Sequence, residues 1–397
     1  MTKMVKRTKT KNNGIIYTTI GAVIASAIVI SQLFAATVVP GQSIQSAVNS
    51  AVAGDIITVS PGVYAETVRI SKNNLTIRCT QSRQCTVKKF EVWGSGNTIE
   101  GFKVTGGTIA GLDVRFQNNV LRDFDIYDIK IASGDANGVI LFGTGHIFDN
   151  IYIHDIDQYA FGDPHQDCFQ TWDVPARGGA ASFITITNVL CDMPQAGNFI
   201  SKALQGEGGA HDWTVRNLIS LAPMACLFID EAYNIDISYS TFIGAGINQP
   251  QGCKFLKVNT SPAPHDNKIT NSIFQNITSG PVIYETGDAV ISSNNCYWQT
   301  SPRSPDPGDV YANPLLLPDY TLGAGSPCAG MGAFPSVNLP TVTPSITQNA
   351  TLTPTLTRTP TPTATHTATP TKTPIIIPTR TPGCVPAWDY WLCNYKP

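Results

Sequence analysis

The amino-acid sequence predicts an all-β chain whose main part, residues 37–334, is a right-handed parallel β-helix solenoid. The first observation is a short strand-like segment that recurs every 27–30 residues. A second series of β-branched, alternating segments interleaves with the first, and no helical periodicity separates them. The first series begins at Gly138, Cys168, Asn198, Cys226, Cys253 and Pro281, and the second at Ile147, Ile184, Thr214, Ile235 and Lys268.

Two short strands per repeat cannot satisfy their own backbone groups, so the repeats are expected to stack as rungs around one core. A β-sandwich, the alternative architecture, does not predict such even spacing. Asparagine recurs at one point of the repeat, where a left-handed backbone and side-chain bonds to the neighbouring rung favour it. These asparagines, expected at a single corner, are Asn150, Asn188, Asn217, Asn271 and Asn294.

The two ends of the solenoid need caps. Residues 43–52 predict an N-terminal capping helix with Ser43 as its N-cap, because Ile44, Ala47 and Val48 fall on one helical face. Residues 312–328 are irregular and rich in turns, which predicts a closing flap at the other end.

The first 36 residues read as an export segment. Five basic residues and no acidic residue precede an apolar run over residues 15–34. A cleaved signal peptide and a membrane tether both fit this run, which is about long enough to span a bilayer. Either reading places the remainder of the chain outside the cytoplasm, secreted or on the cell surface.

The composition changes after Phe334. Residues 335–382 are dominated by threonine and proline, which predicts an extended stalk or linker. Residues 383–397 form a small knob that contains four aromatic residues and two cysteines. The aromatic rings suit either stacking on sugar rings or a minimal hydrophobic cluster around a disulfide.

Ten cysteines without a C-x-x-C pair favour disulfides over metal binding. Two pairs are close in sequence, and we expect local bonds for Cys79–Cys85 and Cys384–Cys393. The strand alignment also places Cys226 and Cys253 in adjacent rungs, close enough for a bond or for stacked thiols. Beyond the basic N-terminal segment the chain is acidic, which argues against nucleic acid as a partner.

Residues 44–66, with Gly54-Asp-Ile-Ile-Thr-Val and Pro61-Gly-Val-Tyr, resemble the first rung of the pectin-lyase-like superfamily of right-handed parallel β-helix proteins. Residues 295–327, with Asn313-Pro and Gly325-Ser-Pro, resemble its last turns. The resemblance implies the fold and leaves the activity open, because the superfamily includes lyases, hydrolases, epimerases and inert surface proteins.

Asp163-Pro164-His165 resembles the Asp-Pro-His element of alginate C5-epimerases, although Gly162 interrupts the usual Phe-Asp-Pro-His order. His165, Asp167 and Gln170 also match a His-x-Asp-x-x-Gln pattern of uncharacterised superfamily members. Several charged residues and histidines gather between residues 154 and 167 of a chain that is otherwise poor in charge, which favours a functional site over mere solvation. The competing interpretation is that His165 only hydrogen-bonds a turn.

Removing the proton next to a uronate carboxylate requires a base and a group that neutralises the developing charge. His165 is the candidate base. Lys202 or Arg177 can neutralise charge, and so can a Ca²⁺ ion bound by Asp163 and Asp167, although no cofactor is certain. Hydrolysis instead needs two carboxylates, for which Asp163 with Asp167, or Asp167 with Asp135, are candidates.

Aligning Gly138, Cys168 and Asn198 places Asn137, Asp167 and Gly197 one above another. The same alignment stacks Lys202 over Trp172, followed by Asp230, Lys257 and Glu285. A solvated ladder of weak ion pairs and one wall of a glycan site both fit that column. Its neighbours complete the candidate substrate-binding set, which is Gln170, Trp172, Asp135 and Arg177.

Two functions from different classes remain open. The first is an enzyme that acts on polysaccharide, a lyase or epimerase for acidic, uronate-containing glycan. The second is a non-catalytic surface protein that binds glycan or a neighbouring cell, which the stalk and the aromatic knob suit equally well. A polysaccharide or cell-surface glycan is the expected partner in both cases.

Overall fold

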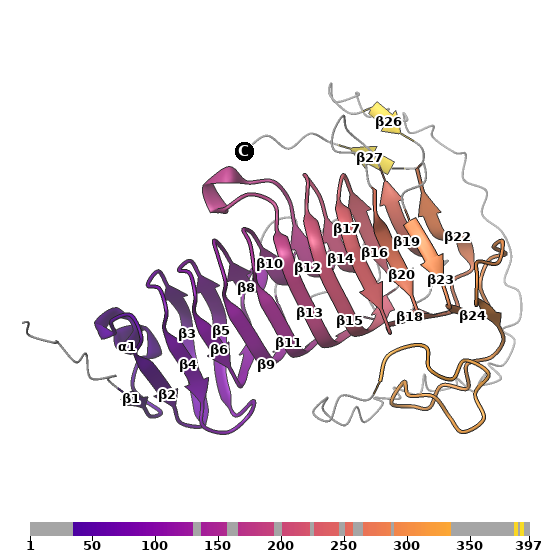
Figure 1. Cartoon of the computed structure of the whole chain (residues 1–397). Coiled ribbons are helices and arrows are strands. Elements are labelled where there is room, and N and C mark those ends of the chain that lie inside the picture. Colours follow the sequence, from indigo (N-terminus) through magenta and orange to yellow (C-terminus); the bar gives the residue numbers. More distant parts are fainter. Residues whose placement is uncertain are drawn as a thin grey trace, which may run out of the picture. The chain divides into compact units, whose positions relative to one another are not determined.

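The computed structural model describes residues 35–129, 136–156, 166–193, 201–222, 226–245, 251–256, 265–286 and 290–334, together with the strands 385–387 and 390–392. The chain divides into two compact units, residues 1–344 and 345–397. The first unit is a right-handed parallel β-helix (Figure 1), as the sequence predicts. In the second unit, the hairpin of β26 (Val385–Ala387) and β27 (Tyr390–Leu392) is antiparallel.

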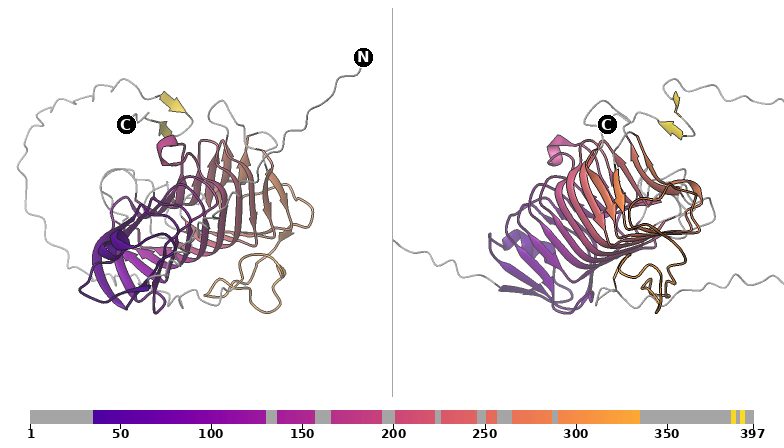
Figure 2. Two further views of the ribbon diagram at one scale, coloured as in Figure 1. Left: turned by 60° about the vertical axis from the view of Figure 1, so that its left-hand side comes forward. Right: turned by 45° about the vertical axis from the view of Figure 1, so that its right-hand side comes forward.

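Three parallel sheets run along the solenoid, and each rung contributes to them in turn (Figures 1 and 2). The first sheet contains the C-terminal parts of β3 (Gly62–Ile70) and β5 (Cys85–Val92), then β8 (Ala110–Val114), β10 (Asn137–Leu141), β12 (Gln166–Thr171), β14 (Ser201–Gly206), β16 (Leu227–Asp230), β19 (Gln251–Leu256) and β22 (Ser279–Glu285).

The second sheet contains β1 (Ala35–Val38), β2 (Ile56–Val59), β4 (Thr76–Cys79), β6 (Thr98–Glu100), the first halves of β9 (Val120–Tyr127), β11 (Ile147–His154), β13 (Ser182–Asp192) and β15 (His211–Ala222), then β17 (Tyr233–Ser238), β20 (Asn267–Thr270) and β23 (Val290–Ser293).

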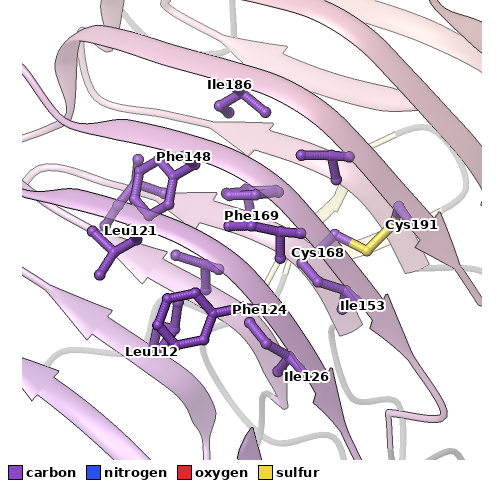
Figure 3. Packing of buried hydrophobic residues seen from close by; sticks show 14 of the residues in the cluster. Leu112, Leu121, Phe124, Ile126, Phe148, Ile153, Cys168, Phe169, Ile186 and Cys191 are labelled. Atoms are coloured by element: carbon purple, nitrogen blue, oxygen red, sulfur yellow. A yellow bond between two sulfur atoms is a disulfide. The ribbon is translucent and has the colours of Figure 1, made fainter. Parts of the chain in front are cut away.

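The third sheet contains the first parts of β3 and β5, then β7 (Phe102–Thr105), the second halves of β9, β11, β13 and β15, and finally β18 (Thr241–Gly244), β21 (Ile273–Gln275), β24 (Cys296–Trp298) and β25 (Val310–Tyr311). Inward-facing apolar side chains of all three sheets form one continuous core, part of which is drawn in Figure 3. Phe124, Phe148 and Phe169 lie in consecutive rungs of that core and are fully buried.

The predicted asparagine corner joins the second sheet to the third. The strand register places Asn150, Asn188 and Asn217 one above another, and all three have a φ of 55–57°. Asn271 and Asn294 continue the column with φ values of 51° and 54°. The Asn217 side-chain amide donates to Asn188 Oδ1 at 2.7 Å. Left-handed geometry and rung-to-rung amide bonds together explain why asparagine recurs here.

A second polar ladder lies inside the core, where the first sheet turns into the second. Asn97 and Asn119 are fully buried, and each accepts a bond from a backbone amide of the preceding rung at 2.9 Å. His146 takes the same position in the next rung: its Nδ1 accepts from the Asn119 amide at 3.2 Å, and its Nε2 lies 2.9 Å from the Phe142 carbonyl oxygen. This pairing requires a neutral imidazole with its proton on Nε2.

Helix α1 (Ile44–Ser50) caps the N-terminal end as predicted, and Ser43 Oγ accepts from the Ser46 amide at 3.1 Å. The Glu66 carboxylate holds the start of the helix, accepting from Ser43 Oγ at 2.8 Å and from the Ile44 amide at 2.7 Å. The Gln45 side chain forms the two hydrogen bonds that a neighbouring strand would form with Arg69. Its Oε1 accepts from the Arg69 amide at 2.6 Å, and its Nε2 donates to the Arg69 carbonyl at 3.0 Å.

Disulfides join Cys79 to Cys85 and Cys226 to Cys253, confirming one predicted local bond and the predicted proximity of adjacent rungs. Cys384 and Cys393 lie outside the described residues. Two further bonds were not predicted: Cys168–Cys191 links the first and third sheets, as drawn in Figure 3, and Cys296–Cys328 ties the irregular C-terminal segment to β24. Within the described part of the chain, no helix is long and apolar enough to cross a bilayer; residues 15–34 lie outside it.

Burial lowers the pKa of His146 from 6.5 to about 4. The unfolded chain therefore binds a proton that the folded protein rejects, and stability is lost as the pH falls from about 6.5 to about 4. We expect protonation of His146 to lower the free energy of unfolding by about 3 kcal/mol between these two pH values. Urea denaturation across that pH range measures the change.

His146→Asn is the matched control, because Asn97 and Asn119 show that an amide oxygen satisfies the same position. The variant should keep its stability near pH 7 and lose most of this acid sensitivity. An unchanged pH dependence in the variant would show that other groups cause the acid sensitivity.

Candidate functional site

A cluster of five buried polar side chains lies on the outer face of the first sheet. It consists of Asn137 on β10, Asp167 and Gln170 on β12, and Lys202 and Gln205 on β14, and each is at most 5% exposed. Polar side chains on the outer face of a sheet are ordinarily solvated, so their burial requires that they satisfy one another.

Asn137 links two rungs. Its Oδ1 accepts from the Asp167 amide at 2.9 Å, and its Nδ2 donates to Gln170 Oε1 at 2.7 Å. The oxygen and the nitrogen of the Asn137 amide are therefore both hydrogen-bonded, which holds the Asp167 backbone and the Gln170 side chain in place. The sequence alignment correctly placed Asn137 against Asp167.

Lys202 lies directly over Asp167 in the strand register. Its Nζ is 3.8 Å from Asp167 Oδ1 and donates to Gln205 Oε1, and Gln205 Nε2 donates in turn to Glu207 Oε1. The pair is 3% and 0% exposed, so the mutual neutralisation of the two charges is what makes their burial tolerable.

This register corrects the predicted column. Lys202 stacks on Asp167 and not on Trp172, because β14 begins at Ser201 and Asp167 pairs with Lys202. The sequence alignment assumed equal rungs and began this strand at Asn198, whereas 35 residues separate the two paired positions. Asp230 pairs with Leu256, so the expected run of alternating charges is not formed there; Lys257 lies outside the described residues.

Trp172 and Arg177 belong to a separate apolar cluster on the same sheet face. The Trp172 ring meets the Phe142 ring edge-on at a centroid distance of 4.9 Å. The short 3-10 helix η1 (Pro175–Arg177) brings the Arg177 guanidinium carbon to 5.1 Å from the centre of the Phe142 ring. The structure therefore gathers Asp167, Gln170 and Lys202 in one cluster and places Trp172 and Arg177 beside Phe142.

Asp163, His165 and Asp135 lie outside the described residues, so their predicted roles stay predictions. His154, counted in the same charged segment, is on the third sheet. Its Nδ1 is 2.7 Å from Asp155 Oδ2 and its Nε2 is 3.0 Å from Asp125 Oδ1. Burial lowers the pKa of His154, but the hydrogen bonds to Asp125 and Asp155 outweigh this effect, so the pKa is raised above its ordinary value.

Lys254 on β19 is a functional candidate that the sequence did not reveal. It pairs in register with Phe228, which itself pairs with Gln205, and the Lys202 ammonium lies 5.3 Å from the centre of the Phe228 ring. Burial, followed by the positive charge of Lys202, lowers the pKa of Lys254. The alternation of Cys253 and Phe255 into the core could have predicted that Lys254 faces outward.

The predicted calcium site of Asp163 and Asp167 falls only in part on the described residues, because Asp163 lies outside them. No three His, Cys, Asp or Glu side chains among them lie close enough together to hold a metal ion. The Asp167 carboxylate faces the Lys202 ammonium, which supplies positive charge where the sequence suggested Ca²⁺. The part that Asp163 could take stays a prediction.

No protein-family model matches the chain, and no curated protein sequence matches it. Solved structures that resemble it include an alginate lyase from Paenibacillus sp. str. FPU-7, with 15% identity over 70% of this chain and 98% of that one at a TM-score of 0.47. The pectate lyase Pel9A has 15% identity over 77% and 93% of the two chains at 0.45. These neighbours are polysaccharide lyases.

A rhamnogalacturonan lyase has 13% identity over 66% of this chain and 87% of that one, at a TM-score of 0.40. The PL6 family alginate lyase AlyGC has 10% identity over 76% of this chain at 0.34, and the chain spans only 56% of its length. All four are similar in β-helix architecture, and at these values they do not transfer an activity to this chain.

Removing one partner of the buried ion pair should leave an uncompensated charge in the cluster. We therefore expect Lys202→Met to lower the free energy of unfolding by about 3 kcal/mol, and Asp167→Asn combined with Lys202→Met to recover part of that loss. Urea denaturation of the two variants and of the unmodified protein measures both effects. A double variant that is no more stable than Lys202→Met would show that the two charges do not compensate each other.

Proposed function

We propose that the protein is a polysaccharide lyase that acts on uronate-containing glycan along the outer face of its first sheet. The observation that carries the proposal is the neighbourhood of Lys202 and Lys254. Lys202 supplies a fixed positive charge. Lys254 has a lowered pKa and can therefore act as a base. Elimination next to a carboxylate needs these two functions together.

Lys202 is held rigidly, because Asp167 and Gln205 both engage its ammonium group. A fixed charge costs little reorganisation when a carboxylate develops enolate character, so Lys202 suits the neutralising role. Lys254 is half-buried and titrates below its ordinary value of 10.5. A larger fraction of its amine is therefore unprotonated near neutral pH, as a general base requires.

In the proposed reaction the Lys254 amine removes the proton on the uronate carbon next to the carboxylate. The electron pair forms a double bond to the neighbouring ring carbon, and the bond from that carbon to the glycosidic oxygen breaks. The departing oxygen takes up the proton from the newly formed Lys254 ammonium, so no proton is consumed overall. The Lys202 ammonium, which is shared with Asp167, partly offsets the negative charge of the substrate carboxylate as that charge increases.

His165 is the alternative base, and Asp163 or Arg177 can assist, as the sequence suggests. A C5-epimerase would share the first step and return the proton to the opposite face without breaking the glycosidic bond. The elimination product carries a carbon–carbon double bond that absorbs in the ultraviolet, so one measurement distinguishes the two reactions.

We also infer export to the cell exterior. Four disulfides within the described residues suit an oxidising compartment, and the basic and apolar residues at the N-terminus suit an export signal or tether. Both are compatible with a polymeric substrate outside the cell.

The test uses the purified full chain with alginate, polygalacturonate and rhamnogalacturonan, and follows the ultraviolet absorbance of unsaturated product. We expect Lys254→Met to lower kcat by at least about 10²-fold. Activity should rise with pH through the lowered pKa of Lys254, because the base must be unprotonated. Lys268→Met is the matched control, since Lys268 is exposed on β20 in the second sheet and should leave the rate unchanged.

His165→Ala is measured in parallel. A loss confined to His165→Ala would assign the base to His165 and overturn the role of Lys254. If none of the polymers yields unsaturated product, the lyase proposal fails. Glycan binding without turnover would then favour the non-catalytic surface protein.

A further inference from the structure

Four aromatic side chains, two of them exposed and two half-buried, form a ladder where the first sheet turns into the second. The aromatic ladder consists of Phe183 and His211 at the starts of β13 and β15, Tyr233 at the start of β17, and His265 just before β20. Register pairs Ser182 with His211 and His211 with Tyr233, so the ladder follows consecutive rungs. It lies around the corner from the polar cluster, since only Glu207 to Ala210 separate β14 from His211.

The rings are ordered by mutual contact. The His211 and Tyr233 rings stack at a centroid distance of 4.8 Å with 6° between their planes, and Tyr233 and His265 stack at 4.8 Å with 14°. Phe183 meets the His211 ring edge-on at 5.6 Å. A stacked row fixes the ring edges in a line along the solenoid axis and lowers the conformational entropy that a ligand would have to remove.

The polar atoms of the ladder are also fixed. His211 Nδ1 is 2.6 Å from Asp212 Oδ2, and His265 Nδ1 is 2.8 Å from Asp266 Oδ2. Asn234 Nδ2 donates to Asp212 Oδ1. Each carboxylate holds Nδ1, which leaves Nε2 as the second polar atom of each imidazole ring, and no described residue bonds either Nε2 atom.

Phe183 is placed against local preference. It has a φ of 54°, at a corner position where the other rungs have Gly145, Asp212, Asn234 and Asp266. Its side chain is 59% exposed. A left-handed backbone is unfavourable for a bulky residue, and the ring gains only an edge contact with His211 while most of it stays exposed, so burial in the core does not account for phenylalanine here.

We propose that the aromatic ladder binds a neutral glycan chain, as a site separate from the one that acts on uronate. An exposed aromatic ring covers the C–H face of a sugar, and the aligned imidazole and phenol edges hydrogen-bond its hydroxyl groups. The charges select against an acidic chain. Asp212 and Asp266 flank the ladder, and none of the corner residues stacked with Phe183, which are Gly145, Asp212, Asn234 and Asp266, is a lysine or arginine. The ladder would anchor the protein on neutral polymer while the first sheet acts on acidic polymer nearby.

The key variant is Phe183→Gly, because glycine accepts the left-handed backbone and removes the ring. Its melting temperature should equal or exceed that of the unmodified protein. Gln299→Gly is the matched control, since Gln299 is also exposed and left-handed, with a φ of 52°, and lies next to β24 in the third sheet.

The full chain is titrated calorimetrically with cello-, manno-, galacto- and xylohexaose, each a neutral oligosaccharide. We expect at least one to bind, with an affinity that falls by at least tenfold in Phe183→Gly and stays unchanged in Gln299→Gly and in Lys254→Met. Phe183→Gly should leave the release of unsaturated product from uronate polymers unchanged, so failure of the lyase proposal would leave this test valid. The inference is overturned if no neutral oligosaccharide binds, or if Phe183→Gly binds as the unmodified protein does, as it would if the C-terminal knob were responsible.

Discussion

Parallel pairing between rungs is the constraint on which the rest of this structure depends. In the strands the backbone groups of one rung pair with those of its neighbours, so a residue is fixed directly over its counterpart in the rung before. A backbone conformation needed once at a corner is therefore needed at every rung. The column from Asn150 to Asn294 shows this, because its members share a left-handed φ although long stretches of chain separate them.

The same constraint determines how charge is distributed on the first sheet. A buried acid can be neutralised by a side chain of an adjacent rung, and Lys202 takes that position over Asp167. From the rung before, Asn137 Oδ1 accepts from the backbone amide of Asp167. The electrostatic effect then reaches further along the sheet, since the charge of Lys202 contributes to the lowered pKa of Lys254. The strand register thus brings the residues of the candidate site together, and a different register would separate them.

The sequence predicts those features of the structure that recur from rung to rung or follow a local rule, and it does not predict the others. The fold, the capping helix and the asparagine corner were predictable, because each repeats at a regular interval or follows a local rule. The sequence placed Lys202 one rung from Asp167 but stacked it over Trp172, so its register was misjudged. The rung between them is longer than the average repeat, and nothing in residues 194–200 announces the extra length.

Features that depend on two distant segments were not predictable in the same way. Cys168 and Cys191 lie on different sheets, and only closure of the rung brings them together. Lys254 looked like an ordinary exposed lysine of a strand, and its interest arises from the neighbouring positive charge. The aromatic ladder is equally hidden, because its four residues come from four rungs and are unevenly spaced in the sequence.

The pairing of Gln45 with Arg69 has a consequence for assembly. A solenoid end exposes an unpaired strand that any second extended chain could extend, which is how fibrils nucleate and grow. At this end one side-chain amide occupies the donor and acceptor of Arg69, while Glu66 fastens the helix that carries it. The helix therefore blocks the addition of a further strand against Arg69 at that end of the solenoid.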